Sequence, residues 1–111
     1  MTIPKPGKPV RGSRSGRPIM ALLDLLGRRW VLRIIWELRD GVLSYVALRV
    51  GCDDMSTSVL SQRLTELKEA GIVIQTDGGD YTLSAEGRSL LHALLPLNDW
   101  AERWSQRERE G

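Results

Sequence analysis

Four small polar side chains recur at helical spacing within residues 56–70, a segment whose leucines also keep a helical period. If Leu60, Leu64 and Leu67 face a core, a rotation of about 100° per residue turns the polar set to the opposite side. The outward set consists of Ser58, Ser61, Gln62 and Thr65. Hydroxyls and amides hydrogen-bond base edges in the major groove of duplex DNA, which an α-helix fits. The pattern predicts a DNA-reading helix, and its alternative is a helix whose polar face is only solvated.

The charges around this face also suit contact with phosphate. No carboxylate precedes Glu66 in the segment, so its first two turns do not repel the DNA backbone. Ser56 is a preferred N-cap, and the free N–H groups and positive dipole end that follow it attract a phosphate. Lys68 and Arg63 flank the face within reach of the backbone. Arg63 has a second interpretation, an ion pair with Glu66 or Asp54 inside the fold.

Basic charge is concentrated in the first part of the chain. Residues 1–17 carry five basic and no acidic side chains, whereas the rest of the chain holds 11 basic and 14 acidic side chains, a net charge of −3. Prolines and glycines leave residues 1–17 without a core-forming pattern, so they are predicted to form a flexible basic arm. Such an arm suits a polyanion, with Arg14 and Arg17 following a minor groove or a phosphate strand. The alternative is a solvated tail that aids solubility.

Arg28 and Arg29 precede Trp30 and have two interpretations, a phosphate clamp or a solvated helix start. A clamp is favoured because basic residues are unfavourable at a helix N-terminus. The complete set of predicted DNA-contacting residues is Ser56, Thr57, Ser58, Ser61, Gln62, Arg63, Thr65, Lys68, Arg28, Arg29, Arg14 and Arg17.

Caps and hydrophobic periods predict one domain over residues 18–111. Pro18 begins the first helix, Gly27 ends it, and Ser44, Ser56 and Ser84 cap later helices. The predicted helices span residues 18–26, 29–40, 45–50 and 57–70, with a long helix after residue 84, and the predicted strands span residues 72–74 and 81–83. A very short strand is expected at residues 42–43. Because Pro96 lies inside the long helix, a kink or break is expected near Leu95.

Two capped helices joined by a tight turn form a helix-turn-helix, and the hairpin directly after them forms a wing. Asp77-Gly78-Gly79-Asp80 suits the hairpin turn because glycine adopts positive φ without strain. The fold class is therefore mainly α with a small β-hairpin wing, a winged helix-turn-helix.

The first and last helices carry apolar stripes that a monomer of this size would leave exposed, which predicts a homodimer. The predicted interface residues are Ile19, Leu22, Leu23, Leu91, Leu94, Leu97, Trp100 and Trp104. Trp30 and Trp36 add to an unusual tryptophan content. Core and dimer packing is the favoured interpretation of the four tryptophans, and an aromatic-lined pocket for an unknown small-molecule effector is the alternative.

Little in the sequence suggests catalysis, a metal or a cofactor. His92 has no cysteine or acidic partners at metal-ligand spacing, and no Ser/His/Asp set or glycine-rich phosphate loop occurs. Cys52 lacks a disulfide partner, and Asp53 and Asp54 are expected to raise its pKa, so it is interpreted as structural rather than reactive. The sequence thus predicts a protein without enzymatic activity, in a reducing cytoplasm and with no membrane segment.

Three runs resemble the HxlR-type winged-helix regulators, relatives of the MarR family. They are residues 22–30 (LLDLLGRRW), residues 59–67 (VLSQRLTEL) with residues 70–73 (AGIV), and residues 81–91 (YTLSAEGRSLL). The resemblance covers about residues 18–104. It implies a homodimeric transcription regulator whose recognition helix lies at residues 56–68 and whose terminal helices form the dimer.

The sequence departs from this family at two places. Many members carry a redox-sensing cysteine before the proline that begins the first helix, where this chain has Arg17, so thiol sensing by that route is excluded. The wing is short, and phosphate repels Asp77 and Asp80 at its tip. The wing is left with the backbone amides of Gly78 and Gly79, or with no DNA contact.

The expected function is that of a sequence-specific regulator that binds double-stranded DNA as a homodimer on an inverted-repeat operator. The alternative is a winged-helix protein-interaction module, which the net charge of −3 outside the arm also fits. A duplex-binding assay distinguishes the two.

Overall fold

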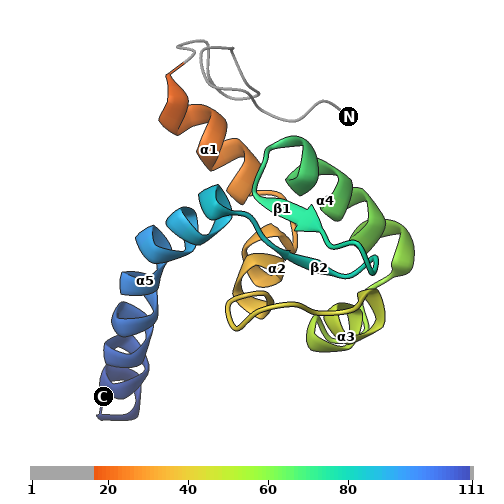
Figure 1. Ribbon diagram of the computed structural model, residues 1–111. Helices are drawn as coiled ribbons and strands as arrows, with labels where there is room; N and C mark the ends of the chain where they lie inside the picture. The colour runs from red at the N-terminus through yellow and green to blue at the C-terminus, as the bar shows by residue number, and fades with distance from the viewer. Residues whose placement is uncertain (1–16, 111) are drawn as a thin grey trace.

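The computed structural model describes residues 17–110 as five helices and one two-stranded hairpin (Figure 1). The helices are α1 (Pro18–Leu26), α2 (Val31–Glu37), α3 (Tyr45–Gly51), α4 (Thr57–Glu69) and α5 (Ala85–Glu110). The strands are β1 (Val73–Gln75) and β2 (Tyr81–Leu83). This order confirms the predicted fold class. Most of the predicted basic arm, Arg14 included, lies outside the described residues.

Serine caps begin three of the helices, as the sequence predicts. The Oγ atoms of Ser44, Ser56 and Ser84 each accept the backbone N–H three residues later, at 3.0, 3.2 and 2.9 Å. Each bond satisfies a donor that the first helical turn leaves without an internal partner. The starts of α3, α4 and α5 are thereby fixed by local sequence.

Helix α2 is shorter than the predicted span of residues 29–40. Its N-cap, Trp30, has a left-handed backbone with φ of 77°, so the preceding arginines are not helical. At the other end Leu38 has left the helical region, and the N–H of Arg39 bonds the carbonyl of Trp36. A bulky residue at positive φ is uncommon, and tertiary packing must hold it there.

The core is centred on α2. Val31, Ile34, Ile35 and Leu38 are each at most 1% exposed, which matches the prediction that this helix lies at the centre of the domain. Around it pack α1, α3 and α5. The remaining core residues include Leu48, Cys52, Met55, Leu60, Leu64, Leu67, Val73, Leu83 and Leu91.

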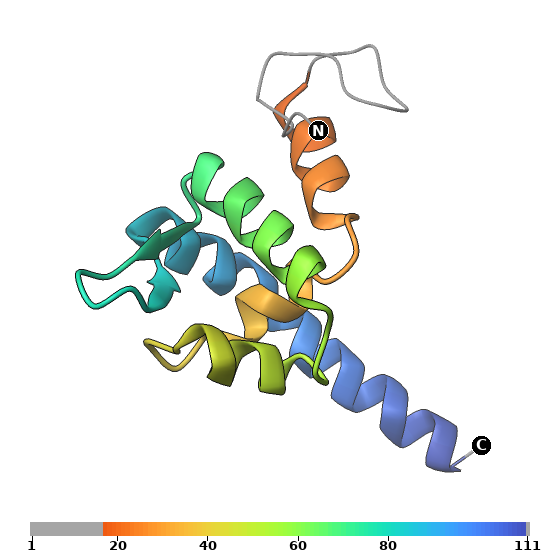
Figure 2. The same ribbon diagram turned by 90° about the vertical axis from the view of Figure 1, so that its right-hand side faces the viewer.

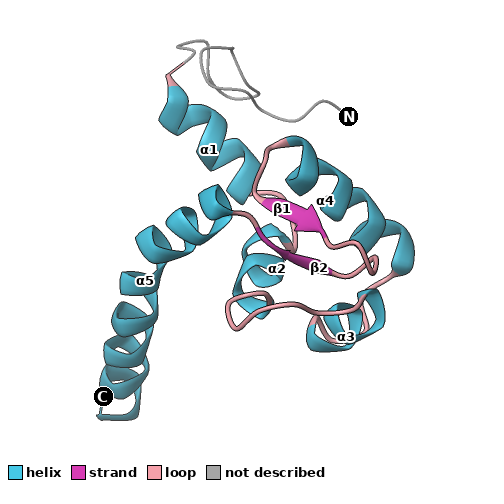
Figure 3. Ribbon diagram, in the orientation of Figure 1, coloured by secondary structure: helices cyan, strands magenta, loops and turns pink. Residues whose placement is uncertain are grey.

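The wing is a short antiparallel hairpin that follows α4 directly (Figure 3). Val73 pairs with Leu83 and Gln75 with Tyr81, and Gly79 takes a φ of 87° in the turn. Instead of the expected strand at residues 42–43, Leu43 forms an isolated bridge with Tyr81, through bonds of 2.9 and 2.8 Å. This bridge ties the segment before α3 to the base of the wing.

Helix α5 continues past Pro96 as one helix, so the break, one of the two expectations near Leu95, does not occur. Figure 1 shows the helix changing direction along its length, as the other expectation, a kink, requires. Figures 1 and 2 show its C-terminal half projecting away from the body formed by α2, α3 and α4, and α1 also projects from that body. From residue 95 onward every described side chain of α5 is exposed. Within residues 17–110, no helix combines the length and the apolar character that crossing a membrane requires.

Candidate nucleic-acid interface

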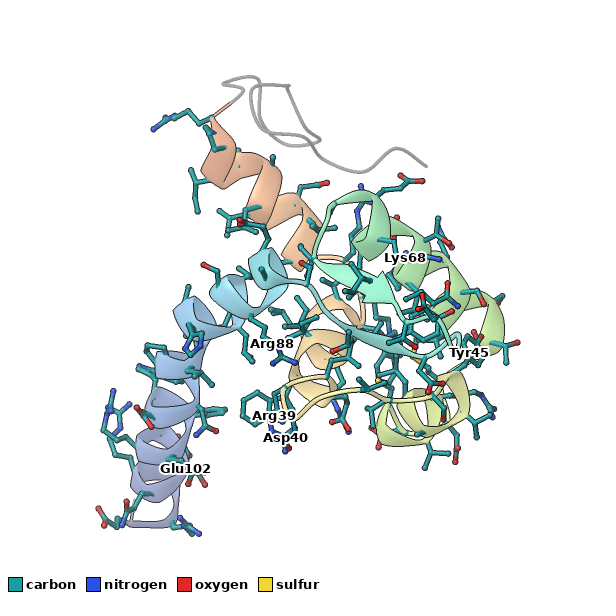
Figure 4. All side chains as sticks on the ribbon, viewed as in Figure 1. Arg39, Asp40, Tyr45, Lys68, Arg88 and Glu102 are labelled. Atoms are coloured by element: carbon teal, nitrogen blue, oxygen red, sulfur yellow. The ribbon has the colours of Figure 1, made fainter. Side chains whose placement is uncertain are left out.

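Helix α4 has one buried face and one exposed polar face. Leu60, Leu64 and Leu67 are at most 2% exposed and pack into the core. The exposed face carries Ser58, Ser61, Gln62 and Thr65, with Ser56, Thr57 and Lys68 at its ends. The structure therefore brings together the helix-borne part of the predicted set, apart from Arg63. In Figure 4, Lys68 of α4 and Tyr45 of α3 lie on the side of the molecule away from Glu102 of α5.

Two hydroxyls on this face are already engaged inside the protein. The Tyr45 hydroxyl donates to the Thr57 carbonyl oxygen at 2.9 Å and also lies 2.9 Å from Ser61 Oγ. The Thr65 hydroxyl donates to the Ser61 carbonyl oxygen at 2.9 Å. These bonds fix the rotamers of Ser61 and Thr65 and restrict the hydrogen bonds that each hydroxyl can offer a ligand.

Gln62 differs from these residues because the described part of the chain gives its amide no hydrogen-bond partner. The residue is exposed. Ser58 Oγ lies 3.4 Å from Ser56 Oγ, a long contact that leaves the Ser58 hydroxyl free to turn. Gln62 therefore keeps the full donor and acceptor capacity of its amide on the exposed face of α4.

The turn between α3 and α4 is held from both sides. Asp53 and Asp54 have φ of 58° and 57°, a left-handed pair that reverses the chain. Arg49 Nε donates to the Met55 carbonyl oxygen at 2.8 Å, and Arg33 of α2 donates to the Gly51 carbonyl oxygen at 2.6 Å. A Cβ at Gly51 would overlap the Glu37 carboxylate. These contacts set the angle at which α4 leaves the turn.

Glu66 lies on the buried side of α4 between two arginines. Its carboxylate, 4% exposed, accepts hydrogen bonds from Arg28 and from Arg63, the latter at 2.8 Å. Arg28 also lies 3.4 Å from Asp24, and Arg63 Nε donates to the Arg29 carbonyl oxygen at 2.8 Å. The fold thus links the end of α1, the loop before α2 and α4.

This cluster corrects two predicted DNA contacts. The Arg28 side chain is 11% exposed and paired with Glu66 and Asp24, so it is not available as a phosphate clamp. The Arg63 side chain is 15% exposed and takes its second interpretation, the ion pair with Glu66. Arg29 is exposed and lies over the Trp30 ring at 5.8 Å, and Arg17 is exposed before α1. Their predicted phosphate contacts stay predictions, and Arg14 lies outside the described residues.

The wing contributes little free donor capacity. The Gly79 N–H donates to the Thr76 carbonyl oxygen at 2.9 Å, which removes one of the two predicted backbone amides. Asp77 at the tip is exposed. Lys68 Nζ lies 3.3 Å from Gln75 Oε1, so β1 guides the lysine along the edge of the exposed α4 face.

Cys52 behaves as the predicted structural residue, although chiefly for another reason. Burial raises the pKa of its thiol to about 11, and the neighbouring Glu37 and Asp53 carboxylates add to the shift, while Arg33 opposes it. Cys52 is 0% exposed. Desolvation therefore outweighs the acidic neighbours on which the sequence argument rested.

The predicted interface residues divide between the surface and the core. Ile19 and Leu23 of α1 are 52% and 54% exposed, whereas Leu22 and Leu94 are half-buried. Leu91 is 7% exposed and belongs to the core, so its assignment to an intersubunit surface is corrected. The exposed apolar residues of α5 are Leu95, Leu97, Trp100 and Trp104.

The tryptophans do not gather into one aromatic pocket. Trp100 and Trp104 stack on each other with ring centroids 5.7 Å apart, on the projecting half of α5. Trp36 instead borders a groove of about 220 Å³ between α2 and α5, and Arg39 stacks on its ring at 4.3 Å. The groove is otherwise lined mainly by leucines. Trp30 is half-buried against the core.

Sequence reasoning missed Tyr45. It follows an N-cap serine on a short helix, and its link to Ser61 spans 16 residues. No local hydrophobic period in the sequence indicates a contact between residues so far apart.

In the described residues no group of three or more histidine, cysteine, aspartate or glutamate side chains is placed to hold a metal ion.

Comparison with known proteins agrees with a helix-turn-helix fold. A family model described as HxlR-like helix-turn-helix matches residues 25–109. An uncharacterised HTH-type transcriptional regulator of Methanocaldococcus jannaschii is 28% identical over 91 residues, covering 78% of this chain and 85% of the relative.

Solved structures show the same fold. Quinone-bound YodB of Bacillus subtilis superimposes with a TM-score of 0.70 at 31% identity, over 78% of this chain and 97% of YodB. A structure from Enterococcus faecalis V583, described as a putative MarR-family regulator, gives a TM-score of 0.72 at 26% identity, over 92% of this chain and 98% of its own. The chain therefore belongs to the HxlR-like helix-turn-helix family, and it is a transcriptional regulator of the helix-turn-helix type.

Proposed function

We propose that the protein binds double-stranded DNA sequence-specifically as a homodimer on an inverted-repeat operator, with α4 as the recognition helix. The observation that carries this proposal is the exposed face of α4, where hydroxyl and amide side chains stand opposite a buried leucine face. The only acid within the first ten residues of α4 is Glu66, which is turned inward and paired with two arginines. The exposed face is therefore free of carboxylates over its first turns, as approach to phosphate requires.

The homodimer is supported by apolar surface on the two projecting helices. Ile19 and Leu23 stand one turn apart on α1, and Leu97, Trp100 and Trp104 form a stripe on α5. Each of these side chains is at least half exposed. A monomer rarely leaves such a stripe in water, and a second copy of the chain supplies an equally apolar partner.

Two-fold symmetry then determines the form of the operator. Two copies of α4 enter successive major grooves on one face of the duplex, at centres roughly 34 Å apart. The half-sites must be inverted because the protein dimer is isologous. In this proposal the exposed side chains of Arg29, Arg17 and Lys68 contact the flanking phosphates and position the dimer without reading sequence.

The test is selection of bound fragments from a pool of random duplexes, followed by binding measurements at low and moderate salt. We expect an inverted repeat with half-sites about one helical turn apart. Recovery of unrelated fragments that bind equally well would leave only nonspecific binding. A protein that binds no duplex at either salt concentration would instead favour a winged-helix module that contacts another protein.

A further inference from the structure

The hydroxyl of Tyr45 makes two contacts but has one proton. It lies 2.9 Å from the Thr57 carbonyl oxygen and 2.9 Å from Ser61 Oγ. A carbonyl oxygen only accepts, so Tyr45 must donate its proton to Thr57. The second contact is a hydrogen bond only if Ser61 donates its proton to the tyrosine oxygen. Proton counting thus settles the direction of the Tyr45–Ser61 bond.

This direction decides what Ser61 presents on the exposed face of α4. A serine hydroxyl has one proton and two lone pairs. With the proton directed at Tyr45, only the lone pairs remain for an outside partner. Ser61 therefore acts as a hydrogen-bond acceptor toward anything that approaches α4.

Thr65 is restricted in the same way by a different contact. Its hydroxyl donates to the Ser61 carbonyl oxygen at 2.9 Å, within α4 itself. Ser61 and Thr65 are four residues apart, so their oxygens lie one above the other on one face. The middle of the exposed face is consequently a pair of acceptors, next to the amide of Gln62.

In the major groove, hydrogen-bond donors are confined to the amino groups of adenine and cytosine, and their position differs among the four base pairs. The geometry points to Tyr45 as a specificity-determining residue that restricts Ser61 to accepting from such an amino group. This inference rests on the proposed function. Tyr45 itself is a positioning residue, because it acts through Ser61.

The first variant is Tyr45→Phe, which removes the hydroxyl and keeps the ring that contacts Tyr81. Ser61 then regains a proton that it can direct at guanine, thymine or adenine acceptors, or back at Thr57. The wild type should prefer one base pair at the position facing Ser61 by roughly three- to tenfold, the range of one hydrogen bond. Tyr45→Phe should reduce this preference to about twofold or less, chiefly by tighter binding of the previously rejected pairs.

The half-site position that faces Ser61 is identified independently, as the one at which Ser61→Ala abolishes the preference among the four base pairs. In that background Tyr45→Phe should change nothing further at this position, because the side chain through which it acts is gone. Tyr81→Phe is the matched control. It removes a hydroxyl that lies 3.3 Å from Gln75, on the wing rather than on α4, so the preference should persist.

Binding is measured on duplexes that carry each of the four base pairs at every half-site position. Preference that survives Tyr45→Phe, or affinity that falls equally on all sequences, would overturn the assignment while leaving the proposed function intact. A wild-type protein that binds no duplex would overturn the proposed function and this inference together.

Discussion

At the residue scale, Gln62 is an exposed α4 side chain whose amide offers a donor and an acceptor together. A glutamine amide can pair with both N6 and N7 of adenine, and such a bidentate contact discriminates by about 1–3 kcal/mol. We expect Gln62→Ala to lose that amount at one base pair of the half-site and to bind other sequences nearly as before. Titrations on duplexes varied one pair at a time measure the effect.

Gln106→Ala supplies the control for Gln62→Ala. Gln106 is exposed on the projecting half of α5, so Gln106→Ala removes the same atoms from a surface other than the exposed face of α4. Its base preferences should match those of the wild type. Equal losses across all duplexes with Gln62→Ala would show that Gln62 does not read a base.

Cys52 leads to a prediction about pH. Burial raises the pKa of its thiol from 9.0 to about 11, so the unfolded chain releases this proton at lower pH than the folded protein does. The unfolded state therefore gains stability as pH rises through that interval, and the free energy of unfolding falls. From about pH 8 to about pH 10.5 this single group should cost about 2 kcal/mol.

Urea unfolding of the wild type and of Cys52→Ala at both pH values isolates this contribution, since other titrating groups are common to the two proteins. The variant should be less stable at the lower pH because of its cavity, yet lose less stability on going to the higher pH. Equal losses in the two proteins would show that the thiol ionises as readily in the fold as in the unfolded chain.

At the scale of elements, the Arg28–Glu66–Arg63 cluster joins α1, the loop before α2 and α4. The carboxylate is 4% exposed and its two partners 11% and 15%, so water does little to replace a lost charge. We expect Glu66→Gln to lower the free energy of unfolding by about 3 kcal/mol, because the partly buried Arg63 loses its carboxylate partner and Arg28 keeps only the longer pair with Asp24. Urea denaturation followed by circular dichroism measures the change.

Asp40→Asn is the same chemical change at the surface. Asp40 is 86% exposed and lies 3.7 Å from Arg39, an arrangement typical of pairs that contribute at most about 1 kcal/mol. Similar losses for Glu66→Gln and Asp40→Asn would contradict the proposed importance of the internal cluster.

The order and the starts of the elements could be predicted because local rules govern them. Ser44, Ser56 and Ser84 are caps whose bonds span three residues, and the period of Leu60, Leu64 and Leu67 identifies the buried face of α4. A structure was needed for contacts distant in sequence. Arg28 meets Glu66 across 38 residues, and Tyr45 meets Ser61 across 16.

The errors in the predicted elements have the same origin. The apolar pattern continued through residues 29–40, yet packing holds Trp30 in a left-handed conformation and shortens α2. Leu91 shares the stripe of Leu94 and Leu97, but only the fold shows that the first half of α5 enters the core while the second half leaves it. A hydrophobic period identifies a face and leaves its partner undetermined.

At the scale of the whole molecule, α1 and the end of α5 project from the central body (Figure 2). We expect the double substitution Trp100→Lys with Trp104→Lys to convert the proposed homodimer into a monomer of 12.5 kDa. Both rings are 50% exposed and stack mainly on each other, so the fold of each protomer should survive their loss. Sedimentation equilibrium gives the mass, and circular dichroism checks the fold.

Glu102→Lys changes charge as strongly on another face of the same helix, and it should leave the mass unchanged. The monomeric double variant should also lose the preference for paired half-sites over a single half-site. A wild type that sediments as a monomer at micromolar concentration, or a double variant that remains dimeric, would refute this assignment of the interface.

The distribution of charge over the chain leads to the last prediction. Residues 1–17 carry a charge of +5, and the remainder carries −3. A domain of net negative charge is repelled by DNA at long range, so we propose that the arm supplies much of the attraction. Removal of residues 1–17 should weaken binding and flatten its salt dependence, by about 0.9 in the logarithmic slope for each phosphate that the arm neutralises. Base preference should persist, because α4 is retained.

Two pairs of substitutions locate the attraction within the arm. Arg14→Gln with Arg17→Gln changes the net charge as much as Lys5→Gln with Lys8→Gln does. If the phosphates lie next to α1, the arginine pair should weaken binding more than the lysine pair, although long-range attraction falls equally in both. An unchanged salt slope after removal of the whole arm would assign the attraction to Arg29, Lys68 and the N-terminus of α4 alone.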